Sequence, residues 1–236
     1  MNLNAQFILY AFAPALAMIL AGMLAIWRAP GLNLRSAIMH FAGGIVFAVV
    51  AIELLPDLLH ERSALATGIG FAIGAAAMLV IRAMTETKEK ASKASGGLLF
   101  ATAVDISIDG LILGIGFAAG AKQGILLTLA LTFELVSLGF ASALEMTQGS
   151  KAHKRVVLAI VGLAFLFVLS ACLGGVLLHF LTGGLLVGVL AFGAAALLFL
   201  VTEELLTKAH EVNENPLLTA SFFVGFLTIL LLELLS

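Results

Sequence analysis

Charge and proline are scarce in this chain, and together these absences narrow its fold class. Only 11% of the 236 residues are charged and four are proline, whereas 62% are apolar. A soluble globule needs more polar surface than this composition supplies, so a water-soluble fold is excluded. Few prolines and long Leu, Ala, Val and Gly runs favour helices over the alternating strands of an outer-membrane barrel. The sequence predicts an all-α polytopic membrane protein.

Cysteine and net charge are also nearly absent. The single cysteine, Cys172, lies in an apolar run and excludes an internal disulfide. A formal net charge of -2 gives no sign of nucleic-acid binding, and we expect no nucleic-acid partner. Residues 1–10 lack a basic segment and precede an apolar stretch too long for a signal peptide, which predicts a retained first span.

Glycine, proline and charged clusters divide the chain into eight apolar segments. The segments are 5–27, 36–59, 64–84, 97–119, 123–146, 156–180, 184–209 and 216–235. Ten of the twelve basic residues fall in or beside the odd-numbered loops, which the positive-inside rule assigns to the cytoplasm. We therefore expect one eight-helix transmembrane domain over 1–236 with both termini outside. The compact length and the lack of a targeting segment favour a prokaryotic inner membrane.

Segments two and seven end in similar sequences. In each, a glycine precedes a glutamate by ten residues, Gly43 before Glu53 and Gly193 before Glu203. Because the two segments cross the membrane in opposite directions, the similarity indicates a 3+2+3 inverted repeat, or else chance likeness between leucine-rich helix ends. The repeats would be 1–84 and 156–236, around the central helices 97–146.

Three acidic residues lie near the middle of their segments. Asp105 and Asp109, four residues apart, share one face of segment four, and Glu134 lies about eleven residues into segment five. One charge at that depth costs on the order of 2.5 to 3.5 kcal/mol. The segment boundaries place no Lys or Arg there. We expect these carboxyl groups to be protonated, solvated in a cavity, or bound to a cation.

Carboxylate oxygens are the usual ligands of hard divalent cations, and several negative charges suit a doubly charged guest. Ser137, one turn beyond Glu134, and Thr102, one turn before Asp105, are candidates for additional oxygens or for hydroxyls that serve helix packing. The alternative is that the acids are neutral and hydrogen-bonded between helices.

Acidic residues near the ends of segments two and seven are candidates for a pathway. Pro56 removes a helix hydrogen bond and frees a backbone carbonyl beside Glu53, which makes this turn a candidate hinge and Glu53 a candidate further ligand. Asp57, Glu203 and Glu204 would line the outward and inward approaches, unless Asp57 and Glu204 extend to the membrane interfaces instead.

Small residues recur in segment four. Its glycines form overlapping small-xxx-small patterns at Gly110, Gly114, Gly116 and Gly120. Such patterns are typical of closely packed membrane helices. We expect this packing to bring Asp105 and Asp109 against segment five.

These features resemble the ZIP (Zrt/Irt-like) family of divalent metal transporters over essentially the whole chain. Besides the eight spans, the resemblance is carried by Gly43-Gly44, by Glu53-Leu54-Leu55-Pro56-Asp57, by Asp109-Gly110 and by the glutamates of segment seven. It implies a secondary transporter, in a homodimer, that moves a divalent cation by alternating access. It also implies that helices one, four, five and six move against two, three, seven and eight.

The metal motifs of the family are only partly present. Asp105 takes the place of a histidine, Ile106 that of an asparagine, and Asp109 and Glu134 stand at acid positions. The remaining positions of the second motif hold Phe133 for histidine or glutamine, Val136 for proline, and Ser137 for a second glutamate. The retained set is all oxygen and favours Mn²⁺, Fe²⁺ or Mg²⁺, although the Irving–Williams order still allows tight Zn²⁺ binding. The losses indicate a divergent member with one metal centre.

Other functions remain open. The same fold would suit a proton-linked carrier of another solute, or a ZIP-like paralogue that does not transport. An intramembrane aspartyl protease fits less well, because Asp105 and Asp109 lie on one helix without the glycine-rich contexts of such enzymes. We expect no enzyme activity and no organic cofactor. The expected partners are a metal ion as cargo, the lipid bilayer and a second copy of the chain.

Overall fold

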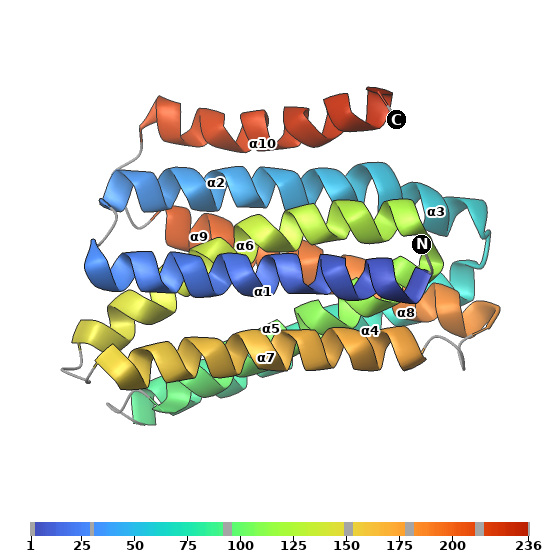
Figure 1. Cartoon of the computed structure of the whole chain (residues 1–236). Coiled ribbons are helices and arrows are strands. Elements are labelled where there is room, and N and C mark those ends of the chain that lie inside the picture. Colours follow the sequence, from blue (N-terminus) through green and yellow to red (C-terminus); the bar gives the residue numbers. More distant parts are fainter. Residues whose placement is uncertain are drawn as a thin grey trace.

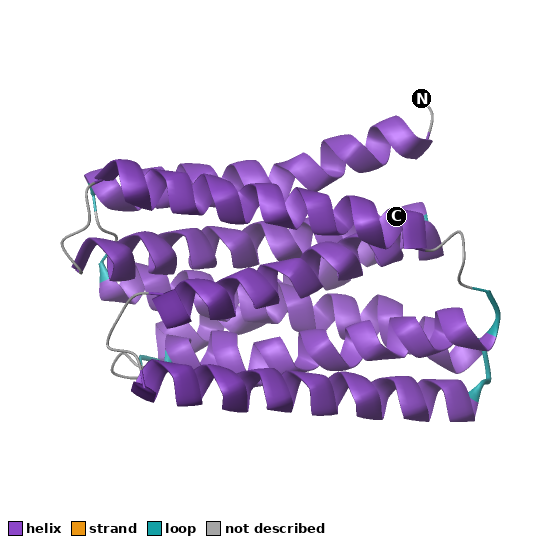
Figure 2. Cartoon of the chain, turned by 90° about the horizontal axis from the view of Figure 1, so that it is seen from below, coloured by secondary structure: helices purple, strands orange, loops and turns teal. Residues whose placement is uncertain are grey.

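A computed structural model of the chain describes residues 3–28, 31–91, 96–148, 153–177, 182–210 and 215–235, and these ranges are helical almost throughout (Figures 1 and 2). No strand occurs in them, so the all-α prediction is confirmed for the described part of the chain. Eight helical rods result: α1 (Leu3–Trp27); α2 (Leu32–Val49) continued by η1 (Val50–Leu54) and α3 (Leu55–His60); α4 (Ala64–Ala91); α5 (Gly96–Ala119); α6 (Ala121–Gln148); α7 (His153–Leu177); α8 (Gly184–Phe199) continued by η3 (Leu200–Leu205) and α9 (Leu206–Ala209); and α10 (Pro216–Leu235).

Seven of these rods contain a stretch long and apolar enough to cross a membrane. The eighth, α5, has 24 residues, and at about 1.5 Å per residue it also exceeds the roughly 30 Å of a bilayer's hydrocarbon core. Large apolar side chains such as Leu65, Phe165 and Leu217 are exposed on the outer rods, where a soluble protein would carry polar groups. This organisation is that of a multi-pass membrane protein.

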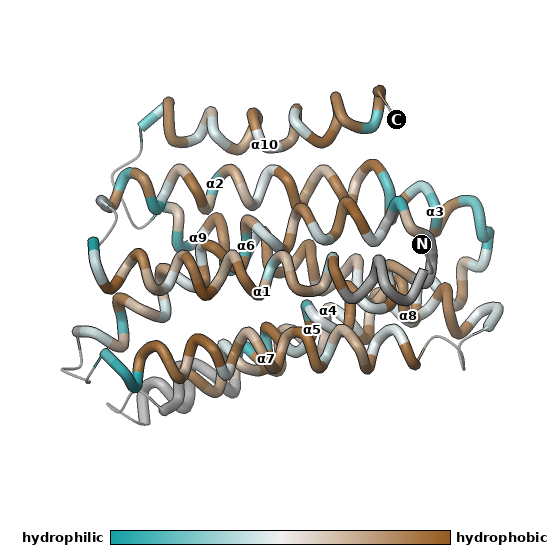
Figure 3. The backbone as a smooth tube through the Cα atoms, in the orientation of Figure 1, coloured by the Kyte–Doolittle hydropathy of each residue, from teal (hydrophilic) through white to brown (hydrophobic). Residues whose placement is uncertain are grey.

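The rods lie roughly along one axis, and successive rods run in opposite directions (Figure 1). The start of α1 and the end of α10 lie at the same end of the bundle (Figure 1). Hydrophobic residues occupy most of each rod, and the hydrophilic positions gather toward the ends (Figure 3). This distribution fits rods that span an apolar layer between two aqueous phases.

Glycines bring four pairs of rods into close contact. The pairs are α1 with α6, α2 with α10, α4 with α8, and α5 with α7. At each contact a β-carbon on the glycine would collide with a backbone oxygen of the neighbouring helix, as at Gly139, Gly44, Gly70 and Gly114. Small residues allow helix backbones to approach closely, and membrane helices associate mainly through such packing.

The rods form two groups. The helices α1, α5, α6 and α7 contact one another, and α2, α4, α8 and α10 form the other group, which meets the first mainly where α2 packs on α6. The opposite meeting place, between α5 and the α4–α8 pair, contains an apolar cavity of about 490 Å³. The two groups are therefore packed tightly on one side and loosely on the other.

Within the described residues, two rods contain a π-helical turn. The turn η1 includes Glu53 and comes just before Pro56, whose missing amide accounts for the local break in α-helical hydrogen bonding that the sequence predicted. The turn η3 includes Glu203 but has no proline within its rod, so no sequence signal announced it. Wider turns of this kind occur mostly as single insertions in α-helices, frequently at functional sites.

Predicted and observed segment bounds agree within a few residues at most ends. The second rod begins at Leu32 instead of residue 36, and α4 continues from the predicted end at residue 84 to Ala91. The division between segments six and seven falls at Gly183, whose φ of 55° suits glycine, and α8 starts at Gly184 as predicted. The predicted end of segment six, 178–180, lies outside the described residues.

Candidate metal centre

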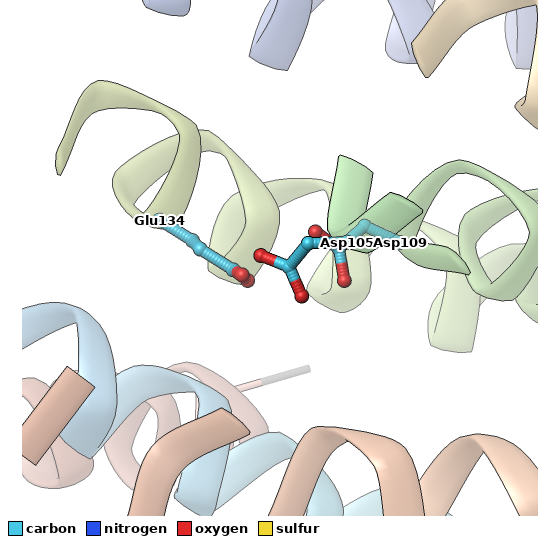
Figure 4. A group of neighbouring side chains, drawn as sticks. All are labelled: Asp105, Asp109 and Glu134. Carbon is cyan, nitrogen blue, oxygen red and sulfur yellow. The ribbon is translucent and has the colours of Figure 1, made fainter. Parts of the chain in front are cut away.

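Three carboxyl groups converge between α5 and α6. Each of Asp105, Asp109 and Glu134 offers one carboxylate oxygen, and these three oxygens lie within 4.8 Å of one another. Glu134 extends from α6 toward the two aspartates on α5 (Figure 4). It stands thirteen residues after the start of α6 and fourteen before its end, so the cluster lies near the middle of the helix. We call these three residues the carboxylate centre.

The carboxylate centre is closed to solvent. The exposed fractions of Asp105, Asp109 and Glu134 are 8%, 2% and 0%. One oxygen of each aspartate and both oxygens of Glu134 are buried without a hydrogen-bond partner. Burying an ionised carboxylate costs several kcal/mol unless a cation and hydrogen bonds compensate. The arrangement therefore requires either protons or a positively charged guest.

The glycines of α5 set the position of the two aspartates, but against a different neighbour from the one predicted. Gly110 and Gly114 lie against the backbone of α7, whereas we expected the contact to be with α6. Gly116 faces Leu127 of α6, and Gly120 is the single residue between α5 and α6. Because this connection is so short, α5 and α6 are antiparallel neighbours. Their packing brings the two aspartates close to Glu134, although Gly110 and Gly114 contact α7.

A basic side chain reaches the centre, contrary to the expectation that no Lys or Arg would lie at this depth. Lys208 and Glu204 line a small cavity of about 10 Å³ together with Glu134 and Ser137. The ammonium of Lys208 donates a hydrogen bond to Glu204 at 2.6 Å, and the carboxyl group of Glu204 interacts with that of Asp105. A long lysine stem can extend from a helix end along apolar surface, and counting along the sequence does not capture this reach.

The hydroxyl groups around the centre divide into two kinds. Ser107 and Thr132 donate hydrogen bonds to carbonyl oxygens of their own helices, at 2.6 Å each, and serve as helix-packing hydroxyls. Ser137 is 4% exposed and faces the cavity below Glu134. Thr102 does not line that cavity. Of the two additional oxygens considered from the sequence, the structure brings Ser137 beside the centre.

Glu53 is not among the residues that converge. It forms an ion pair with Lys122 of α6, at 3.3 Å between Nζ and Oε1, and Lys122 also pairs with Glu233 of α10. The hydrogen bond to Glu233 is the main cause of a raised pKa of Lys122, which lies just before the membrane-spanning part of α6. We call Lys122, Glu53 and Glu233 the lysine triad. The sequence did not reveal it, because its members lie on three helices that are far apart in the chain.

The remaining predicted pathway residues occupy different places. Glu203 pairs with Arg82 of α4 and stays partly exposed, whereas its neighbour Glu204 turns toward the carboxylate centre. Pro56 and Asp57 lie in α3, beyond Glu53 and half-buried. The structure therefore brings Glu204 to the centre and leaves Glu203, Asp57 and Pro56 away from it.

The fold and this site together define a multi-pass helical membrane protein with a buried acidic centre. No protein-family model matches the chain, and no curated protein matches its sequence.

Proposed function

We propose that the protein is a secondary transporter that carries a divalent metal cation through the carboxylate centre. The observation that carries this proposal is the set of three buried carboxylate oxygens within 4.8 Å of one another in the middle of the helix bundle. Oxygens that bind one ion at about 2.0 to 2.6 Å lie no more than about 5 Å apart. Three negative charges more than balance the charge of a divalent ion.

The donor set favours hard ions. Asp105, Asp109 and Glu134 supply only oxygen, and the neighbouring Ser137 would add another. Oxygen ligands suit Mn²⁺, Fe²⁺ and Mg²⁺, while Zn²⁺ binds such sites through its position in the Irving–Williams order. The cargo is a member of this group, carried as substrate and not as a resident cofactor.

Alternating access would arise from a 3+2+3 inverted repeat. The π-helical turns η1 and η3 stand at matching places of rods that run in opposite directions. The repeat would also relate the closely packed helix pairs to one another. The pair α1 with α6 corresponds to α7 with α5, and the pair α2 with α10 corresponds to α8 with α4. Such symmetry underlies many transporters that open alternately to the two sides.

The moving unit would be the group that holds the centre, α1, α5, α6 and α7, sliding against α2, α4, α8 and α10. Its tight contact with the second group is limited mainly to α2 on α6. This division into two helix groups and the sequence motifs named above resemble the ZIP family. The proposal therefore also includes both termini outside, a homodimer and a prokaryotic inner membrane.

Lys208 has a role in this mechanism as a tethered cation. With Glu204 it lies between the centre and the end of the bundle at which α9 ends, the proposed cytoplasmic side. Its positive charge would partly balance the carboxylates when no metal is bound. An arriving divalent ion would then compete with the lysine for the same negative charge.

Transport in proteoliposomes tests the proposal. Wild-type protein is expected to take up Mn²⁺ along a gradient, and Asp109→Asn is expected to reduce uptake to the level of empty vesicles. The matched control is Glu203→Gln, which neutralises an acidic residue away from the centre and should keep uptake. Proton movement without any saturable divalent ion would favour the alternative of a proton-linked carrier, and normal uptake by Asp109→Asn would refute the proposal.

A further inference from the structure

Two imidazole rings meet at the end of the bundle where α2 begins and α9 ends. His40 of α2 and His210, directly after α9, have ring centres 5.1 Å apart, with planes at 70°. Ser36 joins the two elements, since its hydroxyl donates a hydrogen bond to the carbonyl oxygen of Ala209 at 2.8 Å. None of these residues belongs to the carboxylate centre or the lysine triad.

The hydrogen bonds of both rings fix the same tautomer. Nδ1 of His40 lies 2.9 Å from the carbonyl oxygen of Ser36, and Nδ1 of His210 lies 2.5 Å from that of Leu206. A carbonyl oxygen only accepts, so each Nδ1 carries the proton and each Nε2 keeps its lone pair in the neutral ring. Metal-binding histidines are commonly oriented by such a bond from the second nitrogen to a backbone carbonyl.

The free nitrogen of His40 has no partner. Its side chain is 3% exposed, and Nε2 is buried without a hydrogen bond. A buried nitrogen lone pair that accepts no hydrogen bond costs free energy, and a bound ligand can remove this cost. The neighbouring ring of His210 is exposed and supplies a route from solvent.

The separation of the rings fits a shared ion. Two imidazoles that bind one ion at about 2.0 to 2.1 Å with tetrahedral angles have ring centres roughly 5 Å apart. The observed 5.1 Å agrees with this value. We propose that His40 and His210 form a second divalent metal site, with nitrogen ligands, for borderline ions such as Zn²⁺, Co²⁺ or Ni²⁺.

This site differs in chemistry from the carboxylate centre and does not depend on transport. Imidazole suits Zn²⁺, Cu²⁺ and Ni²⁺, whereas carboxylate and water suit Mg²⁺ and Mn²⁺. Two protein ligands leave coordination positions for water, so the ion is exchangeable and not structural. We therefore expect the histidine site to bind Zn²⁺ and not Mg²⁺.

X-ray absorption of the Zn²⁺-loaded full chain in detergent, purified without a histidine tag, tests the site. Wild-type protein is expected to show the outer-shell scattering of imidazole. His40→Ala and the exposed variant His210→Ala should each lose it and bind about one Zn²⁺ fewer per chain. His60→Ala is the matched control and should keep it, because His60 makes the same bond to the carbonyl four residues earlier but lies at the other end of the second rod.

The outcomes separate this site from the proposed transport function. Asp109→Asn should retain the imidazole scattering, since it alters only the oxygen site. Absence of imidazole scattering in wild-type protein, or its persistence in both His40→Ala and His210→Ala, would overturn the histidine site. Loss of Mn²⁺ transport has no bearing on it, and failure of transport in the wild type would overturn only the proposed function.

Discussion

The carboxylate centre and the lysine triad both contain acidic side chains, but the two sites differ in how the negative charge is balanced. In the triad, Lys122 stands between Glu53 and Glu233 and remains half-exposed, so its charges are balanced within the protein and by water. In the centre, three carboxyl groups converge in full burial, and the nearby Lys208 is already paired with Glu204. The comparison teaches that a buried acidic cluster needs protons or a bound cation only when its own surroundings do not neutralise it.

Neutralising one glutamate in each site should give the largest difference in Mn²⁺ affinity between the two sites. We expect Glu134→Gln to weaken Mn²⁺ binding by about a hundredfold or more, because a buried ligand and a charge are both lost. Glu53→Gln is expected to leave the affinity within about threefold. Isothermal titration of Mn²⁺ into detergent-solubilised protein measures both, and equal losses in the two variants would remove the distinction between the sites.

Gly114 supports the helix that carries two of the three carboxylates. A methyl group there would collide with the backbone of α7 at Ala171, so Gly114→Ala should lower the free energy of unfolding by about 1 to 3 kcal/mol. Gly162→Ala is the control, because a β-carbon at Gly162 meets nothing within 4 Å. Thermal unfolding in detergent compares them. A Gly114→Ala variant as stable as the control would contradict the close contact of α5 with α7.

Removing the positive charge of Lys208 should change the affinity for divalent ions in the opposite direction from removing a carboxylate. Lys208→Met is expected to raise divalent affinity several-fold, since like charge near the ion is withdrawn. Lys154→Met, at an exposed position near the start of α7, should leave the affinity unchanged. Mn²⁺ titration followed by electron paramagnetic resonance distinguishes the two, and a weaker site in Lys208→Met would show that the lysine supports binding.

The smallest effect is expected in the triad. Lys122→Met should lower the melting temperature slightly at low salt, and this difference should shrink at high salt, because partly exposed ion pairs are screened. The folded-state pKa of Lys122 is raised, so its contribution is present at neutral pH and is lost only as pH rises through that raised, strongly alkaline value. A salt-independent difference in melting temperature would indicate a packing role instead.

The convergence of Asp105, Asp109 and Glu134 could be predicted because it depends mainly on spacing within single helices. Asp105 and Asp109 share a face by their spacing, and the depth of Glu134 follows from counting along its helix. The sequence placed Glu53 in the same site because depth alone does not say which neighbour a helix face meets. The pairing of Glu53 with Lys122 and Glu233 depends on packing between helices that are far apart in the chain.

Side-chain reach and long-range pairing account for the other differences. Lys208 lies one residue before the predicted end of segment seven, beside an odd-numbered loop, yet its side chain lines the cavity beside Glu134. The contact of His40 with His210 joins positions 170 residues apart, and no spacing rule links them. The π-helical turn η3 has no proline to announce it, although the glycine–glutamate spacing in the sequence already pairs Glu203 of η3 with Glu53 of η1.

The widened turns also govern helical phase. One inserted residue rotates everything after it by about 100° relative to an uninterrupted α-helix. Both rods carry such a turn at a glutamate, Glu53 in η1 and Glu203 in η3, so in each rod the residues beyond the turn point in a changed direction around the helix axis. A deletion of one residue within η1 would rotate the end of that rod, α3, by about 100° against its present neighbours.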